Sequence, residues 1–255
     1  MEQTAIAIAN QKGGCGKTTT AVNLSAGLAL KSYKVLLIDL DPQGAATTGL
    51  GINKWTIEKT IYNVLLDEEV SIQDVVRAVE PQGLDVVPAT LDLSAASMEL
   101  LSQPGREKIL ATKLRQVSGV YDYVILDTPP SLDLLTMNAL VAAKHVLIPV
   151  QTEYYALVGL THLLSLIDKI QERLDVHLDV AYLLTMFDRR TKLSKEVEDE
   201  VHGHAKGKVF KTYIPRNVAL AEAPSHGKPI QLYAPDSAGA QAYAQLVEEV
   251  IQDAW

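Results

Sequence analysis

Residues 10–19 read Asn10-Gln11-Lys12-Gly13-Gly14-Cys15-Gly16-Lys17-Thr18-Thr19, and they lie between a short apolar run and a segment of helical character. Glycines let the backbone turn tightly and direct its N–H groups inward, and the start of a helix adds partial positive charge. Such a loop is a cradle for phosphate oxygens, in which Lys17 reaches the β and γ phosphates and the Thr18 hydroxyl coordinates Mg²⁺. We therefore predict a nucleotide-binding loop from Lys12 to Thr19.

The rest of the chain supplies the alternation of strands and helices that such a loop requires. Short runs rich in Val, Ile and Leu predict buried strands at Ala5–Asn10, Val35–Leu40, Leu84–Pro88, Tyr121–Leu126, Val146–Val150, Val180–Met186 and Val209–Ile214. Helices are predicted in the gaps at Thr18–Leu30, Leu134–Ala143, Leu157–Arg173, Ser194–His204 and Gly239–Ile251. Because the strands are apolar almost throughout, both of their faces should be covered by helices. The expected fold is a doubly wound α/β domain with a mainly parallel sheet.

Length and composition limit the alternatives. A doubly wound sheet of 255 residues can be one domain, and we see no repeat or linker, so residues 1–255 are predicted to form a single P-loop ATPase domain. Residues 49–82 are the least regular part and could hold a short helical excursion between strands. The start of the chain lacks the pattern of a secretory signal, and no run approaches roughly 18 apolar residues, so we expect a cytoplasmic protein without a membrane span. A single Cys15 excludes an intrachain disulfide.

Carboxylates follow two of the predicted strands. Asp39 and Asp41 end the second strand, and Asp127 ends the strand that begins at Tyr121. Ligands of α/β proteins bind at the carboxyl edge of the sheet, so all three side chains are expected near the phosphate loop. Pleating could turn both Asp39 and Asp41 toward the loop, although Pro42 could divert Asp41. Asp127 is predicted to hold Mg²⁺ through water, as in a Walker B strand.

The loop departs from the strict G-x-x-x-x-G-K-[ST] pattern, because Gln11 occupies the place of the first glycine. It resembles the deviant Walker A motif K-G-G-x-G-K-[ST] of the ParA/MinD class of ATPases, with Cys15 at the variable position. The resemblance implies that Lys12 acts in trans on the nucleotide of a partner, like an arginine finger, in an ATP-dependent homodimer. It also implies that Asp41 orients the attacking water and helps to hold Mg²⁺ through its hydration shell.

The segment Ile214-Pro215-Arg216-Asn217 is similar to the I-P-R-N stretch of the Soj form of this family. The resemblance implies that Pro215 and Asn217 contact adenine. It extends along nearly the whole chain, including residues 151–157, and it makes the chain resemble ParA/Soj chromosome-partitioning ATPases. ATP and Mg²⁺ are the cofactors that this implies, and a ParB-like protein is the implied activator.

The ParA/Soj resemblance also implies binding to double-stranded DNA without sequence preference, and hence an association with the nucleoid. The net charge of −8 argues against this for the whole surface, but residues 188–228 carry nine Lys or Arg against six Asp or Glu. The candidate DNA contacts are Arg189, Arg190, Lys192, Arg216 and Lys228. Ordinary solvated charges are the competing interpretation. Many relatives carry an arginine where this chain has Ala219, which leaves the strength of DNA binding open.

Other members of the superfamily are alternatives. A membrane-positioning protein of the MinD type would end in a basic amphipathic helix, whereas this C-terminus pairs its apolar stripe with Glu248, Glu249 and Asp253. Packing in the core is therefore the favoured interpretation of that stripe, and no membrane partner is expected. An iron-protein reductase needs several cysteines as cluster ligands, whereas this chain has only Cys15, inside the phosphate loop, which argues against that class. A metabolic ATP-dependent ligase is a further alternative.

Overall fold

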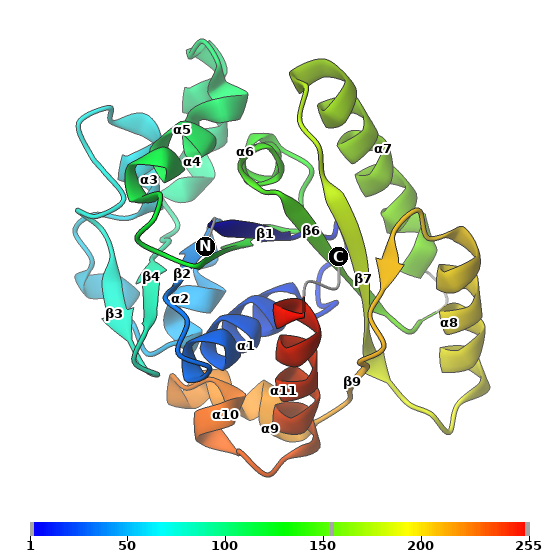
Figure 1. Ribbon diagram of the computed structural model, residues 1–255. Coiled ribbons are helices and arrows are strands. Elements are labelled where there is room, and N and C mark those ends of the chain that lie inside the picture. The colour runs from blue at the N-terminus through cyan, green and yellow to red at the C-terminus, as the bar shows by residue number, and fades with distance from the viewer. Residues whose placement is uncertain (1–2, 154–155, 253–255) are drawn as a thin grey trace.

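The computed structural model describes residues 3–153 and 156–252, which fold around a nine-stranded sheet (Figure 1). The strands are β1 (Thr4–Ile8), β2 (Val35–Asp39), β3 (Arg77–Val79), β4 (Leu84–Val87), β5 (Tyr123–Asp127), β6 (His145–Gln151), β7 (Asp179–Phe187), β8 (Lys208–Val209) and β9 (Ile214–Pro215). Their order is β3-β4-β2-β5-β1-β6-β7-β8, and β9 also pairs with β7. Only β3 runs antiparallel to its neighbour in this described sheet. The predicted mainly parallel α/β fold is confirmed.

Helices cover both faces of the sheet (Figure 1). One face carries α3 (Ile61–Leu66), α4 (Leu93–Glu99), α5 (Ile109–Leu114), α6 (Leu134–Ala142), α7 (Ala156–Leu174) and α8 (Lys192–His204). The other carries α1 (Lys17–Leu30), α2 (Ala45–Gly49), α9 (Val218–Glu222), α10 (Ile230–Tyr233) and α11 (Ala238–Ile251). Short 3₁₀ turns occur at Lys54–Thr56, Leu100–Ser102, Arg106–Lys108, Arg115–Val117 and Ala223–His226.

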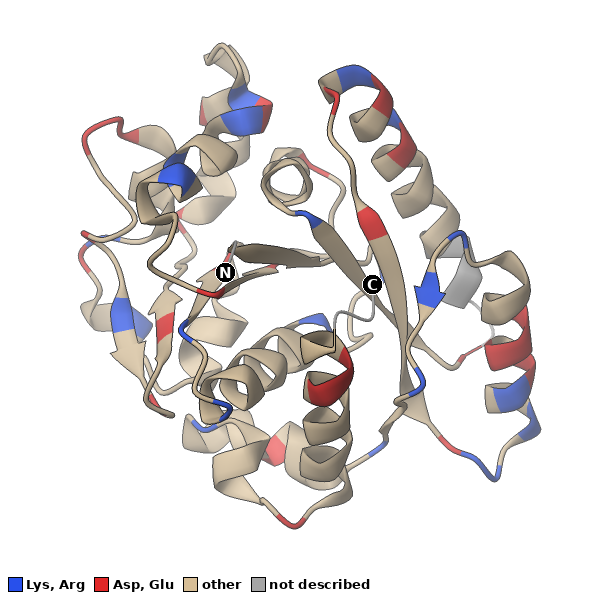
Figure 2. Cartoon of the chain, viewed as in Figure 1, with Lys and Arg blue, Asp and Glu red and all other residues tan. Residues whose placement is uncertain are grey.

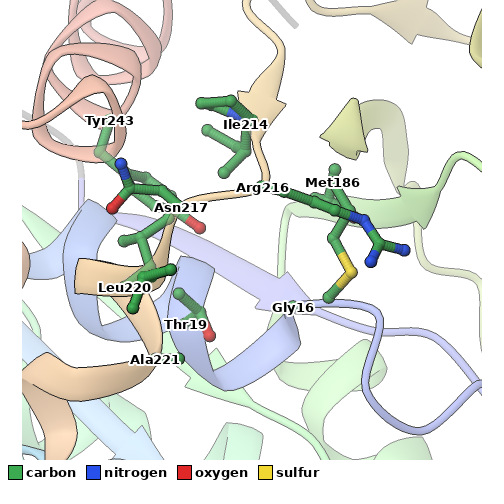
Figure 3. Close-up of a pocket in the computed structure, with 12 residues that line it drawn as sticks. Gly16, Thr19, Met186, Ile214, Arg216, Asn217, Leu220, Ala221 and Tyr243 are labelled. Atoms are coloured by element: carbon green, nitrogen blue, oxygen red, sulfur yellow. The ribbon is translucent and has the colours of Figure 1, made fainter. Parts of the chain in front are cut away.

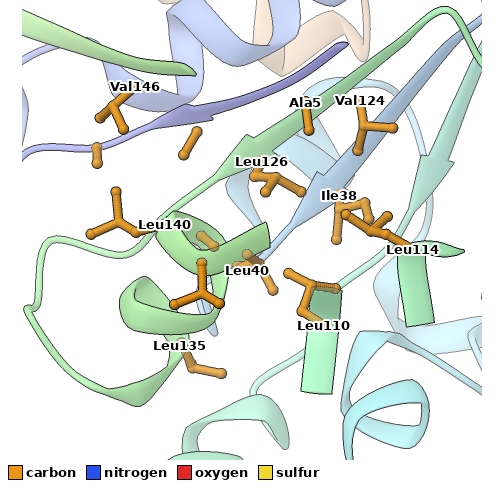
Figure 4. Packing of buried hydrophobic residues seen from close by; sticks show 14 of the residues in the cluster. Ala5, Ile38, Leu40, Leu110, Leu114, Val124, Leu126, Leu135, Leu140 and Val146 are labelled. Atoms are coloured by element: carbon orange, nitrogen blue, oxygen red, sulfur yellow. The ribbon is translucent and has the colours of Figure 1, made fainter. Parts of the chain in front are cut away.

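The strands are buried on both sides, which explains their nearly continuous apolar sequences. Along β1, Ala5 and Ala7 belong to the core under α3 to α8, whereas Ile6 and Ile8 belong to the core under α1 and α11. Figure 4 shows the first of these cores, in which Ala5 lies close to Val124 and Leu126 of β5. Successive side chains point to opposite faces, so each face needs its own apolar set. This arrangement leaves the carboxyl edge of the sheet for the site.

The sequence prediction was wrong for the last strand. In place of one strand at Val209–Ile214, the structure has the two short strands β8 and β9, both paired with β7. Between them, the backbone N–H groups of Lys211 and Thr212 donate to the carboxylate of Glu249 on α11, at 3.0 and 2.9 Å. The side chain of Glu249 therefore takes the donors that a continuous ladder would have used. Residues 49–82 contain α3, which agrees with the expected short helical excursion, and the edge strand β3, which the sequence did not reveal.

The C-terminal helix α11 packs against α1 through its apolar stripe. Tyr243, Leu246, Val247 and Val250 are all buried in the core beneath the two helices. The stripe is therefore part of the core, as the sequence favoured, and is not a free amphipathic face. Within residues 3–153 and 156–252, no helix combines the length and the apolarity needed to cross a membrane.

A buried lysine anchors the segment between α3 and β3. Lys113 is 7% exposed, and its Nζ donates to the carbonyl oxygens of Asp67, Glu68 and Val70 at 2.8, 3.1 and 2.7 Å. Lys113→Met keeps the aliphatic stem but leaves these acceptors without their donor, so we expect a loss of about 1–3 kcal/mol of folding free energy. Urea denaturation measures this loss. The exposed Lys108→Met is the control, and an equal effect of both substitutions would contradict the anchoring role.

Candidate nucleotide site

The loop between β1 and α1 has the backbone conformation of a phosphate cradle. Gly14 and Gly16 have φ of 72° and 94°, a left-handed region that favours glycine, and Gly16 is the N-cap of α1. Lys17 is 6% exposed, and its Nζ donates to the carbonyl oxygen of Lys12 at 3.1 Å. The Lys17 ammonium thus lies inside the curve of the loop. The helix start and this ammonium create a site for an anion.

Cys15 contributes structure to the loop. Its side chain is fully buried, and its carbonyl oxygen accepts a hydrogen bond from Thr185 Oγ1 of β7 at 2.8 Å. Burial raises the pKa of the Cys15 thiol, although the charge of Lys17 partly opposes this. A protonated, buried thiol is a poor nucleophile, so Cys15 acts as a small residue that lets the loop pack on β7.

Asp39 and Asp127 are neighbours in the pairing of β2 with β5, and both are fully buried. Asp39 holds the turn after β2, because its carboxylate accepts from the Thr47 N–H and hydroxyl at 2.9 and 2.7 Å and from the Asp41 N–H at 3.1 Å. Burial raises the pKa of Asp39 to about 6, although these hydrogen bonds lower it. Asp39 is therefore a turn carboxylate. Asp41 is half-buried at that turn and accepts from the Gln43 N–H at 2.9 Å.

Asp127 differs from Asp39 in its surroundings. Neither of its buried carboxylate oxygens has a hydrogen-bond partner of standard geometry among the described residues. Burial, reinforced by the charge of Asp39, raises the pKa of Asp127 well above its usual value, and the nearby Thr18 hydroxyl and Lys17 ammonium offset this only in part. A buried carboxylate with unused acceptors beside a threonine hydroxyl fits a hydrated Mg²⁺ bound to phosphates. The described residues contain no cluster of three His, Cys, Asp or Glu side chains that could bind a metal alone.

Lys12 points away from its own loop. Its Nζ is 3.1 Å from Glu153 Oε2, just beyond the end of β6, and its N–H donates to Asn10 Oδ1 at 3.0 Å. The Lys12 side chain is 28% exposed. The two lysines of the motif therefore separate, with Lys17 inside the loop and Lys12 at the surface.

A cavity of about 380 Å³ continues from the loop toward α11 (Figure 3). Its lining includes Gly16 and Thr19 from the loop side, Pro215 at the end of β9 and Asn217 just after it. It also includes Met186 and Tyr243, which the sequence did not suggest. The Asn217 Oδ1 atom is buried and lacks a hydrogen-bond partner among the described residues. Met186 has φ of 53°, which is strained for a residue with a side chain. An apolar cavity with an unused amide acceptor fits a nucleobase that carries an amino group.

Part of the basic surface also comes together. Arg189, Arg190 and Arg216 line a second hollow of about 530 Å³ with Tyr213, Gln241 and Gln245. Lys192 starts α8 and pairs with Glu196 at 3.2 Å, and Lys228 lines a separate hollow beside Thr18 and Thr19. Figure 2 shows Lys and Arg in the segment between β7 and α8. Of the sequence candidates for DNA contact, the structure groups three arginines.

Known proteins resemble this chain along nearly its whole length. Residues 3–180 match the family model described as an AAA domain. The sporulation initiation inhibitor protein Soj of Bacillus subtilis is 52% identical over 96% of this chain and 97% of that protein. The chromosome partitioning protein ParA of Myxococcus xanthus is 50% identical over 97% of this chain and 87% of that protein. This chain belongs to the ParA/Soj family of chromosome-partitioning ATPases.

Solved structures share the fold of this ParA/Soj chain. Cobyrinic acid a,c-diamide synthase of Mycobacterium smegmatis, with a bound ATP analog and magnesium, has a TM-score of 0.86 at 33% identity, covering 98% and 95% of the two chains. A putative plasmid partition protein of Borrelia burgdorferi, bound to AMPPNP, has a TM-score of 0.82 at 27% identity, covering 98% and 99%. The ParA/Soj relatives are the more similar in sequence, which favours partitioning over the metabolic alternative. Of residues 151–157, Tyr154 and Tyr155 lie outside the described residues.

Proposed function

We propose that the protein is a partitioning switch that binds Mg-ATP, forms a dimer around two nucleotides, coats DNA without sequence preference and hydrolyses ATP slowly until a ParB-like partner accelerates it. In the cell it would then associate with the nucleoid in the cytoplasm and position a chromosome or plasmid. The observation that carries the proposal is that three features adjoin one another: the buried Asp127 carboxylate beside Thr18, the loop that contains Lys17, and the cavity with the Asn217 oxygen. Within the part of the chain that the structure describes, neither the Asp127 oxygens nor the Asn217 oxygen has a hydrogen-bond partner of standard geometry.

The chain's own residues divide the work of nucleotide binding. The N–H groups of Gly13 to Thr18 and the Lys17 ammonium bind phosphate oxygens, and Thr18 and Asp127 would hold Mg²⁺, Asp127 through water. The metal supplies charge neutralisation at the phosphates. Asp41 is half-buried at the rim of the site, where its carboxylate can orient a water molecule toward the γ phosphate.

Lys12 is the residue proposed to act on a partner. Its side chain points away from the phosphate loop, and its partly exposed ammonium pairs with Glu153. Since the Lys12 ammonium is bound to Glu153 and not within its own cradle, it could exchange Glu153 for the phosphates of a second protomer that docks face to face. A cation delivered across an interface stabilises the charge that develops during phosphoryl transfer.

Three arginines around one hollow support the DNA-binding part of the proposal. Arg189, Arg190 and Arg216 are exposed, and two protomers would add their charges along a phosphate backbone. Arg190 is held by Asp188 in a two-bond pair of 3.0 and 2.8 Å, so part of this charge is compensated in the free protein. Ala219, two residues after Asn217, adds no charge to this surface.

Asn217→Ala is expected to weaken ATP binding roughly fivefold to tenfold, because it removes one hydrogen bond to the adenine amino group. Titration with a fluorescent ATP analogue measures the affinity. Asn53→Ala is the control, because Asn53 caps the 3₁₀ turn Lys54–Thr56 and does not line the cavity. If Asn217→Ala binds ATP as tightly as the unsubstituted protein, Asn217 does not contact the adenine base.

Co-sedimentation tests the proposed function directly. With ATP, the protein is expected to pellet with plasmid DNA, and with ADP or without nucleotide it should stay in the supernatant. Liposomes with anionic lipids replace DNA in a parallel experiment. Binding to liposomes without binding to DNA would favour a MinD-type positioning ATPase instead.

A further inference from the structure

The carboxylate of Glu153 joins three side chains from separate parts of the chain. Its Oε2 accepts from Lys12 Nζ at 3.1 Å. Its Oε1 accepts from Gln151 Nε2 at 2.6 Å and from Arg216 NH2 at 3.1 Å. In Figure 3 the Arg216 side chain extends away from Asn217 and Tyr243. One carboxylate thus connects the end of β6, the phosphate loop and the segment after β9.

The ammonium of Lys12 has three N–H donors, and those that bind Glu153 are not available to the phosphates of a partner's nucleotide, so the two anions compete for Lys12. A lysine side chain is long and flexible, so it can exchange one anion for another. When Lys12 leaves, the carboxylate still accepts from Gln151 and Arg216 and is not left unpaired. The departure of Lys12 is therefore inexpensive, since an abandoned buried charge is what makes such separations costly.

We propose that Glu153 is a positioning residue that retains Lys12 within its own subunit until the nucleotide of a partner competes for it. This inference rests on the proposed ATP-dependent dimer. Glu153 then sets the ATP concentration at which dimers form, and it prevents Lys12 from favouring association in the absence of a triphosphate. The Lys12 and Glu153 side chains are 28% and 43% exposed, so the effect should be moderate, up to about fivefold.

Glu153→Gln tests the inference, because it keeps the shape of the side chain and removes its charge. Sedimentation velocity across an ATP titration should show half-maximal dimerisation at an ATP concentration up to about fivefold lower than for the unsubstituted protein. The affinity of dilute monomers for ATP should not change. A structural role alone would not separate these two readouts.

Asp188→Asn is the matched control. It removes one negative charge near Arg216 and releases Arg190, because the Asp188 carboxylate accepts its side-chain hydrogen bonds from Arg190. It should leave the ATP dependence of dimerisation unchanged. Glu153→Asp retracts the carboxylate by one methylene and should shift the dependence in the same direction as Glu153→Gln, so it decides the matter if Glu153→Gln does not fold.

The outcomes separate the inference from the proposed function. If the unsubstituted protein forms no dimer with ATP, the proposed function fails. If it does, and Glu153→Gln behaves like Asp188→Asn or requires more ATP, Glu153 does not restrain Lys12 and the inference is overturned.

Discussion

Asp127→Asn is expected to raise the melting temperature of the nucleotide-free protein by several degrees and to abolish its Mg²⁺-dependent ATP hydrolysis. Asp127 is fully buried, and its oxygens lack partners of standard geometry among the described residues. Asparagine has almost the same shape but no charge to bury beside Asp39. Relief of an unsatisfied buried group contributes about 1–3 kcal/mol. If Asp127 holds Mg²⁺ as proposed, the carboxylate is retained for the metal at the expense of stability.

The dependence of stability on pH follows from the same pair. The pKa of Asp39 rises from 3.8 to about 6, and that of Asp127 rises as well, chiefly through burial in both cases. The folded protein therefore holds these protons at a pH where the unfolded chain has released them. For Asp39 this contribution to stability is complete below about pH 3.8 and is lost as the pH rises through about 6, and for Asp127 it is likewise lost as the pH rises through its raised pKa. Asparagine at position 127 does not titrate, so the variant avoids part of this loss of stability. Its gain in melting temperature over the unsubstituted protein should therefore be greater at pH 7.5 than at pH 5.

Differential scanning fluorimetry at the two pH values, together with a phosphate-release assay, measures both effects. Asp199→Asn, on the exposed face of α8, is the control for the loss of one negative charge. A melting temperature of Asp127→Asn below that of the unsubstituted protein at pH 7.5 would mean that the carboxylate has partners that stabilise the fold.

Substitutions of the two lysines of the loop should impair different properties, ATP binding for Lys17 and ATP hydrolysis for Lys12. Lys17→Gln removes the ammonium inside the cradle, so the affinity of the monomer for ATP should fall roughly 10- to 100-fold. Lys12→Gln should leave that affinity within about twofold, because the Lys12 ammonium is bound to Glu153 and does not point into the cradle. Its ATPase activity should nevertheless fall by about 10³, the usual contribution of a cation supplied across an interface.

Titration with a fluorescent ATP analogue on dilute protein gives the first quantity, and phosphate release at high protein concentration gives the second. Lys34→Gln, an exposed lysine at the opposite edge of β2, is the matched control. If Lys12→Gln weakens monomer binding as strongly as Lys17→Gln does, the two lysines bind the same nucleotide.

Continuous apolar runs were sufficient to predict the central strands, because a strand covered on both faces needs apolar side chains at every position. The phosphate loop was equally recognisable, since Gly14, Gly16 and Lys17 meet backbone and charge requirements that few other structures impose. Local sequence did not reveal the split between β8 and β9. That split depends on Glu249, which lies on α11 and takes the N–H groups of Lys211 and Thr212.

Tertiary contacts also decided which acidic residues are structural. Asp39 and Asp127 both end apolar strands, yet Asp39 accepts hydrogen bonds from Thr47, whereas Asp127 has no partner of standard geometry among the described residues. The position of Thr47 relative to Asp39 depends on the turn after β2, which no periodicity describes. Glu153 lies in the stretch 151–157 that resembles the family, but its contacts could not be predicted, because its partners Lys12 and Arg216 are far from it along the chain.

Mixing two inactive variants tests most directly whether Lys12 acts in trans. Lys12→Gln keeps its own Asp41, and Asp41→Ala keeps its own Lys12, so a mixed dimer contains one complete site. An equal mixture should recover about a quarter of the activity, since half of the dimers are mixed and one of their two sites is complete. A mixture that stays as inactive as each variant alone would show that Lys12 does not act on the nucleotide of a partner.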